Sequence, residues 1–433
     1  MTDPDILVSQ LLDAGRQLGL PVSCEEAFRG GDLVTWHASP SARFAISTAE
    51  QPLPHAVPDS ECIAVVPAAQ DGEQGLWRGL RSGEFGLWHT LTWDALADWL
   101  EQRSGETAPR ETRPQQLAAT VVENSAASAL HHRLRLRCPE IARDAQPGQF
   151  LQVWCVSPEQ VTEFEQHKNR ELTGGPWPQA ELMAGLPLLR RPMSIHHVSS
   201  SLGESPLAPL PRALRRRIER PCRDQLDLLI KLVGRGAHEL SKRQPGEVVD
   251  IIGPLGKPVA IRPDLRHALV IAGGIGLAPL LHLTEELCWL GVSTQFLIGV
   301  RNREHLPLSR GKGHTGAGRS IEQLEAMGVK VTVVSEEEDG MMVTAYLAAH
   351  RAELFAECDE VFACGPKPML MQVSKLIGDR VPCQVLLEER MACGVGACRS
   401  CVTKLRSTEP PGFILRTVCH DGPAFPASEV IWQ

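Results

Sequence analysis

The sequence predicts a multidomain protein in which an antiparallel β-barrel precedes an α/β domain with a parallel sheet and a small cysteine-rich C-terminal domain. Short apolar runs separated by Gly, Pro and polar turns from about residue 117 to 262 indicate the barrel. Near-continuous apolar runs that alternate with helical segments from 263 to 380 indicate a parallel sheet covered on both faces. Four of the 13 cysteines are bunched between 393 and 419, within a C-terminal domain of residues 381–433, and residues 1–103 read as an additional α+β domain.

The composition excludes several classes of protein. A chain of 433 residues with 43% hydrophobic and 22% charged residues is typical of a soluble protein with several cores. The formal net charge of −8 argues against binding to nucleic acid. No run reaches the roughly 18 to 20 apolar residues that cross a bilayer, and the acidic N-terminus does not resemble a secretory signal. We therefore expect a cytoplasmic protein with neither a membrane nor a nucleic-acid partner.

The N-terminal domain, residues 1–103, is predicted to contain two helices. Asp3 and Pro4 suit the cap and first turn of a helix that runs to about Leu18, and Thr92 is a candidate cap for a second helix. Residues 104–116 have the polar, Pro-containing composition of a linker. Nothing in these residues indicates a function.

The barrel, residues 117–262, is predicted from six strands. Two interruptions, near 157–188 and 199–224, are expected to be surface insertions. The six runs are LAATVVE, LRLRC, QFLQVWCV, MSIHHV, LDLLIKLV and VVDIIG.

Two segments of the barrel carry candidate binding residues. Arg190 and Arg191 precede Ser194, and such a pair can hold a phosphate while the hydroxyl bonds the edge of a ring. Downstream, Gly234 and Gly236 form a flexible Gly-x-Gly segment beside a loop that can admit a cofactor. Barrel turns with exposed arginines are the alternative interpretation of each segment.

The α/β domain, residues 263–380, has a glycine-rich turn between a buried strand and a helix. Gly273, Gly274 and Gly276 would let the backbone approach a pyrophosphate at the helix N-terminus. The pattern GG-x-G-x-x-P departs from the usual G-x-G-x-x-G fingerprint, and such turns also serve packing alone. A second strand, EVFACGP, ends in Cys364, Gly365 and Pro366, which are expected beside the first turn.

The cysteines of the C-terminal domain, residues 381–433, have the spacing of a plant-type [2Fe–2S] ferredoxin. Cys393, Cys398 and Cys401 follow C-x4-C-x2-C, and Cys419 is the distant fourth ligand. The small residues between the first two cysteines, such as Gly394 and Gly396, leave room for backbone N–H groups to face cluster sulfurs. Structural zinc is the alternative, although zinc sites usually pair two C-x2-C knuckles.

Seven segments together resemble the ferredoxin–NADP reductase superfamily and, within it, the electron-transfer subunits of bacterial NAD-dependent dihydroorotate dehydrogenases. The resemblance covers roughly residues 115–425. It does not extend to residues 1–103 or to the two insertions. The segments are RRPMS, GRGAHELS, GPLG, GGIGLAP, CGPKPML, LEERMACGVGAC and VCHDGPAF.

The resemblance implies three cofactors, namely FAD, NAD(H) and a [2Fe–2S] cluster. Arg191 would lie near the flavin phosphates, and Ser194 would face flavin N5. Ala237 replaces the hydroxyl residue that the family usually carries. The implied FAD residues are Arg191, Pro192, Met193, Ser194, Gly234, Gly236, Ala237 and His238; the implied NAD(H) residues are Gly273, Gly274, Gly276, Cys364, Gly365 and Pro366; the implied cluster ligands are Cys393, Cys398, Cys401 and Cys419.

The resemblance also implies an electron-transfer oxidoreductase. A nicotinamide moves two electrons as hydride and an iron–sulfur cluster accepts one, so a flavin must stand between them. Ser194 and Cys364 are the candidates beside the reacting rings. The implied partner is a flavin-containing subunit, the FMN-bearing dihydroorotate dehydrogenase, in a hetero-oligomer.

Three alternatives stay open. One is a reductase subunit of another anaerobic or electron-bifurcating complex. A second, from a different class, is a zinc-bearing, non-catalytic redox sensor or interaction module. The third concerns the nucleotide: Arg301 follows the strand TQFLIGV where a 2′-phosphate could be met, which keeps NADP(H) open.

Overall fold

The computed structural model describes residues 113–156, 189–199, 223–308 and 320–432, together with six strands nearer the N-terminus. Contacts within the chain divide it into two units, which are described separately. The helices expected from Asp3 and Thr92 lie outside the described residues, as do the predicted insertion 157–188 and most of the second one.

The N-terminal unit contains one six-stranded sheet whose strands follow chain order. All neighbours are antiparallel except β3 and β4, which are parallel. The strands are β1 (Val22–Ala27), β2 (Gly31–Trp36), β3 (Ala42–Ile46), β4 (Cys62–Val65), β5 (Trp77–Leu80) and β6 (His89–Leu91).

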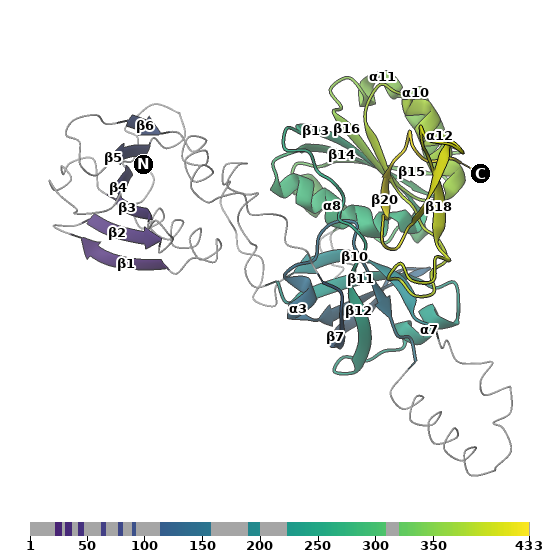
Figure 1. Ribbon diagram of the computed structural model, residues 1–433, viewed down its shortest axis with the longest axis horizontal. Coiled ribbons are helices and arrows are strands. Elements are labelled where there is room, and N and C mark those ends of the chain that lie inside the picture. Colours follow the sequence, from purple (N-terminus) through teal and green to yellow (C-terminus); the bar gives the residue numbers. More distant parts are fainter. Residues whose placement is uncertain are drawn as a thin grey trace, which may run out of the picture. The chain divides into compact units, whose positions relative to one another are not determined.

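The second unit begins with a closed antiparallel barrel in the order β10-β11-β8-β7-β12-β9 (Figure 1). Each of the six apolar runs noted in the sequence overlaps one of its strands, so the predicted barrel is confirmed. Two short helices, α3 (Pro139–Ala142) and α7 (Arg235–Ser241), lie against it. The strands are β7 (Gln115–Ser128), β8 (His131–Arg137), β9 (Phe150–Val153), β10 (Arg191–Ser199), β11 (Gln225–Lys231) and β12 (Val248–Leu255).

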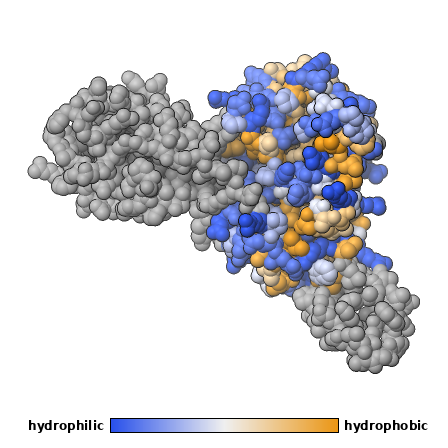
Figure 2. Space-filling model, viewed as in Figure 1, coloured by the Kyte–Doolittle hydropathy of each residue, from blue (hydrophilic) through white to orange (hydrophobic). Residues whose placement is uncertain are grey.

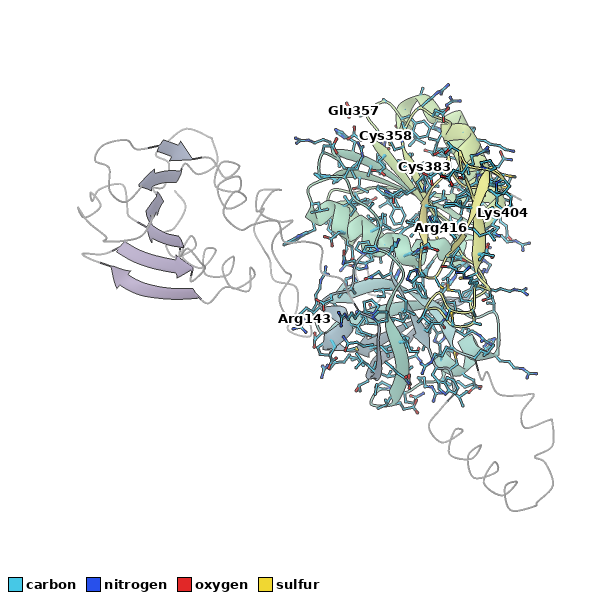
Figure 3. All side chains as sticks on the ribbon, in the orientation of Figure 1. Arg143, Glu357, Cys358, Cys383, Lys404 and Arg416 are labelled. Atoms are coloured by element: carbon cyan, nitrogen blue, oxygen red, sulfur yellow. The ribbon has the colours of Figure 1, made fainter. Side chains whose placement is uncertain are left out.

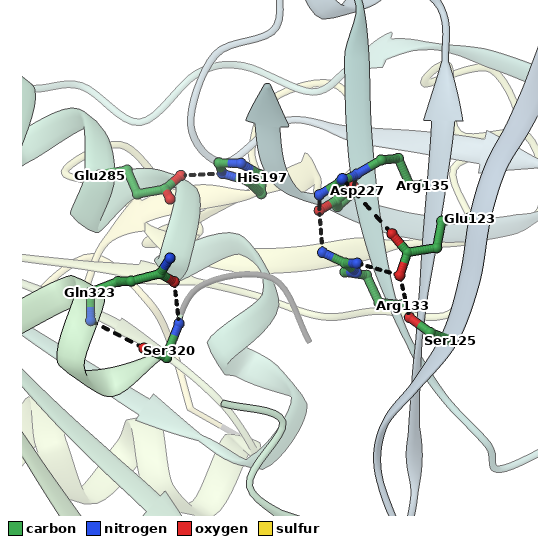
Figure 4. A network of polar contacts seen from close by, with 9 residues as sticks. All are labelled: Glu123, Ser125, Arg133, Arg135, His197, Asp227, Glu285, Ser320 and Gln323. Carbon is green, nitrogen blue, oxygen red and sulfur yellow. Dashed lines mark hydrogen bonds and ion pairs between the residues drawn. The ribbon is translucent and has the colours of Figure 1, made fainter. Parts of the chain in front are cut away.

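A buried charge network crosses one wall of the barrel. The Asp227 side chain is fully buried, and its Oδ1 lies 2.7 Å from Arg135 Nε (Figure 4). Arg133 connects Asp227, at 3.5 Å, to Glu123, at 2.7 Å. Burial opposes ionisation of Asp227, but the hydrogen bond from Arg135 and the positive charges of both arginines hold its pKa below the usual value. The network therefore stays ionised inside the protein.

The α/β part contains a second six-stranded sheet in the order β15-β14-β13-β16-β17-β20. All neighbours are parallel except β17 and β20, which are antiparallel. The predicted parallel sheet is thereby confirmed. Its strands are β13 (His267–Gly273), β14 (Ser293–Val300), β15 (Lys330–Ser335), β16 (Glu360–Cys364), β17 (Cys383–Leu386) and β20 (Ala424–Pro426).

Successive residues of β13 enter opposite cores, as a sheet covered on both faces requires. Val270 packs with residues of α8 (Leu277–Trp289) and α9 (Ile321–Ala326), whereas Ile271 packs with residues of α10 (Val343–Ala349) and α12 (Lys367–Ile377). Ser320 and Gln323 cap the start of α9 by reciprocal side-chain and backbone hydrogen bonds (Figure 4). The remaining short elements are η1 (Gly274–Gly276), η2 (Arg303–His305) and α11 (Arg351–Leu354).

The C-terminal segment is joined to this sheet at both ends. β17 pairs with β16, and β20 returns to pair with β17. Between them lie the four cysteines and a two-stranded hairpin of β18 (Val402–Arg406) and β19 (Phe413–Thr417). The domain boundary expected at residue 380 therefore falls just before a strand of the nucleotide sheet.

Helix α8 connects the barrel to the α/β part. His196 Nδ1 on β10 lies 3.0 Å from the Ala278 carbonyl oxygen, and His197 Nδ1 lies 2.7 Å from Glu285 Oε2 (Figure 4). Burial lowers the pKa of His196 to about 4, so its imidazole is neutral. In the part of the chain that is described, no helix combines the length and the apolar character that a bilayer crossing demands.

Candidate functional site

The two arginines at the start of β10 have different surroundings. Arg190 forms a 2.5 Å ion pair with Asp250, and its guanidinium lies 5.4 Å from the centre of the Trp154 ring. Arg191 instead donates to the Leu189 carbonyl, at 3.0 Å, and to that of Arg190. Arg190 is therefore held by the barrel, whereas Arg191 keeps a guanidinium with donors that can bind a phosphate.

Helix α7 and Arg191 meet at Gly236. A Cβ added to Gly236 would lie 3.1 Å from Cys155 Sγ and 3.2 Å from Arg191 Cγ, so a larger residue would displace the arginine. The expectation of a flexible segment from Gly234 to Gly236 is wrong, because helix α7 begins at Arg235. Ala237 is buried in the barrel core and His238 is exposed. The structure thus brings the two predicted flavin segments together.

Ser194 lies where β9 and β10 pair. Its partner in the register is Phe150, and Pro192 is paired with Gln152. Phe150 packs in the same core cluster as Cys401 and Cys419. Strand β9 therefore connects the predicted flavin face with the predicted cluster loop.

The predicted nucleotide residues lie together at the carboxyl ends of β13 and β16, where Ala272 is paired with Cys364. A Cβ on Gly276 would collide with the Cys364 carbonyl group, and one on Gly273 would collide with Met369. Gly274 has φ of +55° and open space where its Cβ would be. Two of the glycines thus serve close packing, and Gly274 provides the exposed backbone that a phosphate can approach.

Cys364 is buried at the end of β16 beside this turn, and the Glu388 charge lies close to it. Burial and the nearby Glu388 charge raise the pKa of the Cys364 thiol well above its usual value, so the thiol is neutral. The Glu388 side chain reaches solvent, yet the protein surrounds its carboxyl group closely enough that burial raises its pKa despite the Lys231 charge. Glu388 was not among the site residues predicted from the sequence, although it is part of the segment LEERMACGVGAC.

The four cysteines line a loop whose backbone turns back on itself. Gly394 and Gly396 have φ of +74° and +80°. The backbone N–H groups of Val395 and Cys398 each lie 3.4 Å from Cys393 Sγ. A further N–H, that of Gly396, lies 3.2 Å from Cys419 Sγ. The left-handed glycines aim N–H groups at sulfur, which is the arrangement that iron–sulfur ligation requires.

The thiols are arranged as two pairs. Hydrogen bonds from Ser400 and from Cys393 lower the pKa of Cys398 to about 6. Burial and a hydrogen bond with Cys401 raise the pKa of Cys419 to about 12. Among the described residues, no three His, Cys, Asp or Glu side chains converge on one point as ligands of a single ion. Two pairs suit a two-iron cluster, in which each iron takes two thiolates, better than tetrahedral zinc.

Comparisons with known proteins give a consistent assignment. Residues 388–431 match the family model described as the iron–sulfur cluster binding domain of dihydroorotate dehydrogenase B. An electron transfer subunit of dihydroorotate dehydrogenase B (NAD(+)) from Desulforamulus reducens is 30% identical over 297 residues, which are 68% of this chain and 90% of that protein. The corresponding subunit from Bacillus caldolyticus is 32% identical over 249 residues, 57% of this chain and 81% of its own.

A solved structure shares the fold. An NADH-dependent reduced ferredoxin–NADP oxidoreductase has a TM-score of 0.51 at 20% identity, over 72% of this chain and 90% of its own. The identity and the coverage of the relatives settle the family. This chain belongs to the family of electron transfer subunits of dihydroorotate dehydrogenase B (NAD(+)).

Proposed function

We propose that this chain carries electrons between a dihydroorotate-oxidising, flavin-containing subunit and NAD⁺ through its own [2Fe–2S] cluster and FAD. The observation that supports the proposal is that the three candidate sites belong to one unit: the Arg191–Ser194 strand, the Gly273–Gly276 turn and the four cysteines. A flavin exchanges two electrons with a nicotinamide and one at a time with a cluster, so the three cofactors complete a redox chain.

The barrel residues would bind and orient FAD. The Arg191 guanidinium would hold the phosphates, and the backbone from Gly234 to Gly236 would lie beside the pyrophosphate. The Ser194 hydroxyl would hydrogen-bond the edge of the flavin ring. Ala237 contributes only packing, because its methyl group lies in the core.

The turn after β13 would bind the nucleotide, with the backbone at Gly274 next to its phosphates and Cys364 and Glu388 lining the ring pocket. Because the Cys364 thiol is neutral, its role is to shape the pocket, and no nucleophilic step is assigned to it. Gly365 and Pro366 complete the turn beside Gly273.

The surroundings of Arg301 favour NAD(H) over NADP(H). Arg301 Nε lies 3.3 Å from Glu337 Oε1, and Asn302 donates to the same carboxylate at 2.8 Å. A carboxylate at this place accepts hydrogen bonds from ribose hydroxyls and repels a 2′-phosphate. Glu337 lies far from Arg301 in sequence, so the sequence alone does not reveal this pairing.

The hairpin beside the cysteine loop would bind the catalytic subunit. Val402 and Leu415 are 39% and 56% exposed, and they line a groove with Trp432. Figure 2 shows hydrophobic residues gathered on the side of the molecule where β18 lies in Figure 1. Lys404 and Arg416 add positive charge to the same hairpin (Figure 3). We propose a hetero-oligomer in the cytoplasm, with an FMN-bearing partner whose surface is apolar and acidic.

Anaerobic reconstitution with the catalytic subunit tests this function. We expect dihydroorotate-dependent reduction of NAD⁺, together with flavin absorption, iron and acid-labile sulfide in this chain. The Cys401→Ser variant should lose the cluster and the coupled activity while it retains FAD. NADH-driven reduction without any dihydroorotate activity would instead indicate another complex. A colourless protein that holds zinc would refute the proposal.

A further inference from the structure

Gln152 on β9 has no role in the proposed function, and the burial of its side-chain amide is energetically unfavourable. The residue is 0% exposed. Neither its Nε2 nor its Oε1 has a hydrogen-bond partner among the residues that the structure describes. A buried amide without partners costs about 1–3 kcal/mol, so an unpartnered one points to a group that is bound there.

The amide faces the cysteine loop and not the barrel interior. Leu151 and Val153 pack in the barrel core, so the alternation along β9 turns Gln152 outward, on the same face as Phe150. A Cβ added to Gly394 would lie 2.5 Å from Gln152 Cγ and 2.6 Å from its Nε2. The amide therefore lies against the residue that follows Cys393, which explains why that position needs glycine.

The same amide is close to the predicted flavin strand. Gln152 is paired with Pro192 on β10, two residues before Ser194. The Arg190 guanidinium contacts the backbone carbonyl of Gln152 at 3.5 Å, so the strand is held at this point. Gln152 is thus the residue at which the flavin side of the barrel contacts the loop of the cluster.

We propose that the Gln152 side-chain N–H donates a hydrogen bond to a sulfur of the cluster bound by the Cys393 loop and thereby sets its reduction potential. This inference rests on the function proposed above. Sulfur is an acceptor, and the amide is a buried donor beside the loop that has no acceptor among the described residues. The reduced cluster carries one more negative charge than the oxidised one, so a donor stabilises the reduced form and raises the potential.

Two variants of the full chain test the proposal. Gln152→Met keeps the length of the side chain without the donor, and Gln152→Glu keeps its shape but adds negative charge. In anaerobic redox titrations followed by electron paramagnetic resonance, Gln152→Met should shift the one-electron equilibrium about tenfold towards oxidised cluster, which is about 59 mV. Gln152→Glu should shift it further in the same direction.

Gln116→Met is the matched control. Gln116 is also a barrel glutamine, but its amide donates at 2.8 Å to the exposed Asp250 carboxylate. Its replacement should leave the cluster potential unchanged. An equal shift in the control would show that the potential responds to barrel stability and would overturn the assignment of Gln152.

The stability of cluster-free protein distinguishes a hydrogen bond to the cluster from a merely structural role. Because the amide has no hydrogen-bond partner in the described part of the chain, Gln152→Met should be at least as stable as the wild type when the cluster is absent. A destabilised cluster-free variant would contradict the proposal. If Gln152→Met does not fold, that result also contradicts it, and Gln152→Glu still reports the potential.

The test separates this inference from the function on which it rests. Wild-type protein without a cluster signal after reconstitution would refute the proposed function itself. A wild-type cluster signal, with the same midpoint potential in both Gln152 variants, would refute only the role of Gln152.

Discussion

At the scale of single residues, two acids in the described part of the chain differ in how well nearby positive charges compensate for their reduced contact with water. Asp227 is fully buried between Arg133 and Arg135, whereas the Lys231 charge only partly offsets the effect of the protein surroundings on the pKa of Glu388. These two acids therefore respond to pH in opposite directions.

Asp227→Asn should destabilise the protein by about 3–5 kcal/mol, because it leaves two buried or half-buried arginines without their carboxylate. The pKa of Asp227 is lowered by folding, so its contribution is present above the unfolded-state pKa of about 3.9 and is lost as the pH falls through the folded-state pKa. Urea denaturation at pH 7 and pH 3 checks this. The free energies of unfolding of the wild type and the variant should differ less at pH 3 than at pH 7. An equal difference at both would contradict it.

Glu388→Gln should raise the melting temperature at pH 7. Folding raises the pKa of Glu388, so the folded protein gains stability as the pH falls and the carboxyl group is protonated. The advantage of the variant should accordingly shrink towards pH 4, where the wild-type side chain is also neutral. Calorimetry across this range provides the measurement; an advantage that grows on acidification would show that the sign is wrong.

At the scale of elements, the glycine turn after β13 combines two different uses of one residue type. Position 276 needs glycine because the carbonyl of Cys364 lies where a Cβ would be. Position 274 favours glycine because its backbone is left-handed, and the space beside it is open. Only the second use concerns the ligand directly.

Gly276→Ala should therefore destabilise the protein by more than Gly274→Ala, because β13 and β16 must separate to admit the methyl group. Gly274→Ala should cost about 1–2 kcal/mol from backbone strain alone and should weaken NADH binding. Denaturation curves and titration of NADH against flavin bleaching separate the two effects. Equal stability losses would refute the distinction.

The sequence predicted the elements better than their interactions. The runs around Val270 and Ile271 predicted a buried strand because their apolar character is local. Helix α7 was missed because two glycines at its start disfavour a helix, and only packing against Arg191 and the barrel core reveals why they are there. Glu388 and Gln152 were missed because the groups close to their side chains, Lys231 and Gly394 respectively, are distant in the sequence.

At the scale of the whole molecule, the hairpin of β18 and β19 and the predicted nucleotide turn belong to different elements, and we propose a different partner for each. A change on the hairpin should therefore uncouple the subunits without affecting the reaction with NADH.

Leu415→Asp should abolish or strongly weaken the complex with the catalytic subunit while NADH:ferricyanide reductase activity stays at the wild-type level. The introduced charge opposes burial of a side chain that is 56% exposed in the free chain. Size-exclusion chromatography and activity assays provide both readouts. Val248→Asp, at another exposed apolar site that is 44% accessible, is the control and should leave the complex intact.

The anchoring of the cysteine loop has a mechanical consequence. The loop departs from β17 and returns at β20, and these two strands pair with each other. Both attachment points thus belong to the sheet that carries the nucleotide turn. We therefore expect the cluster loop to stay in place relative to this sheet during electron transfer. Raising the solvent viscosity with glycerol should consequently leave the rate of electron transfer within the chain unchanged, although it slows every step that depends on diffusion.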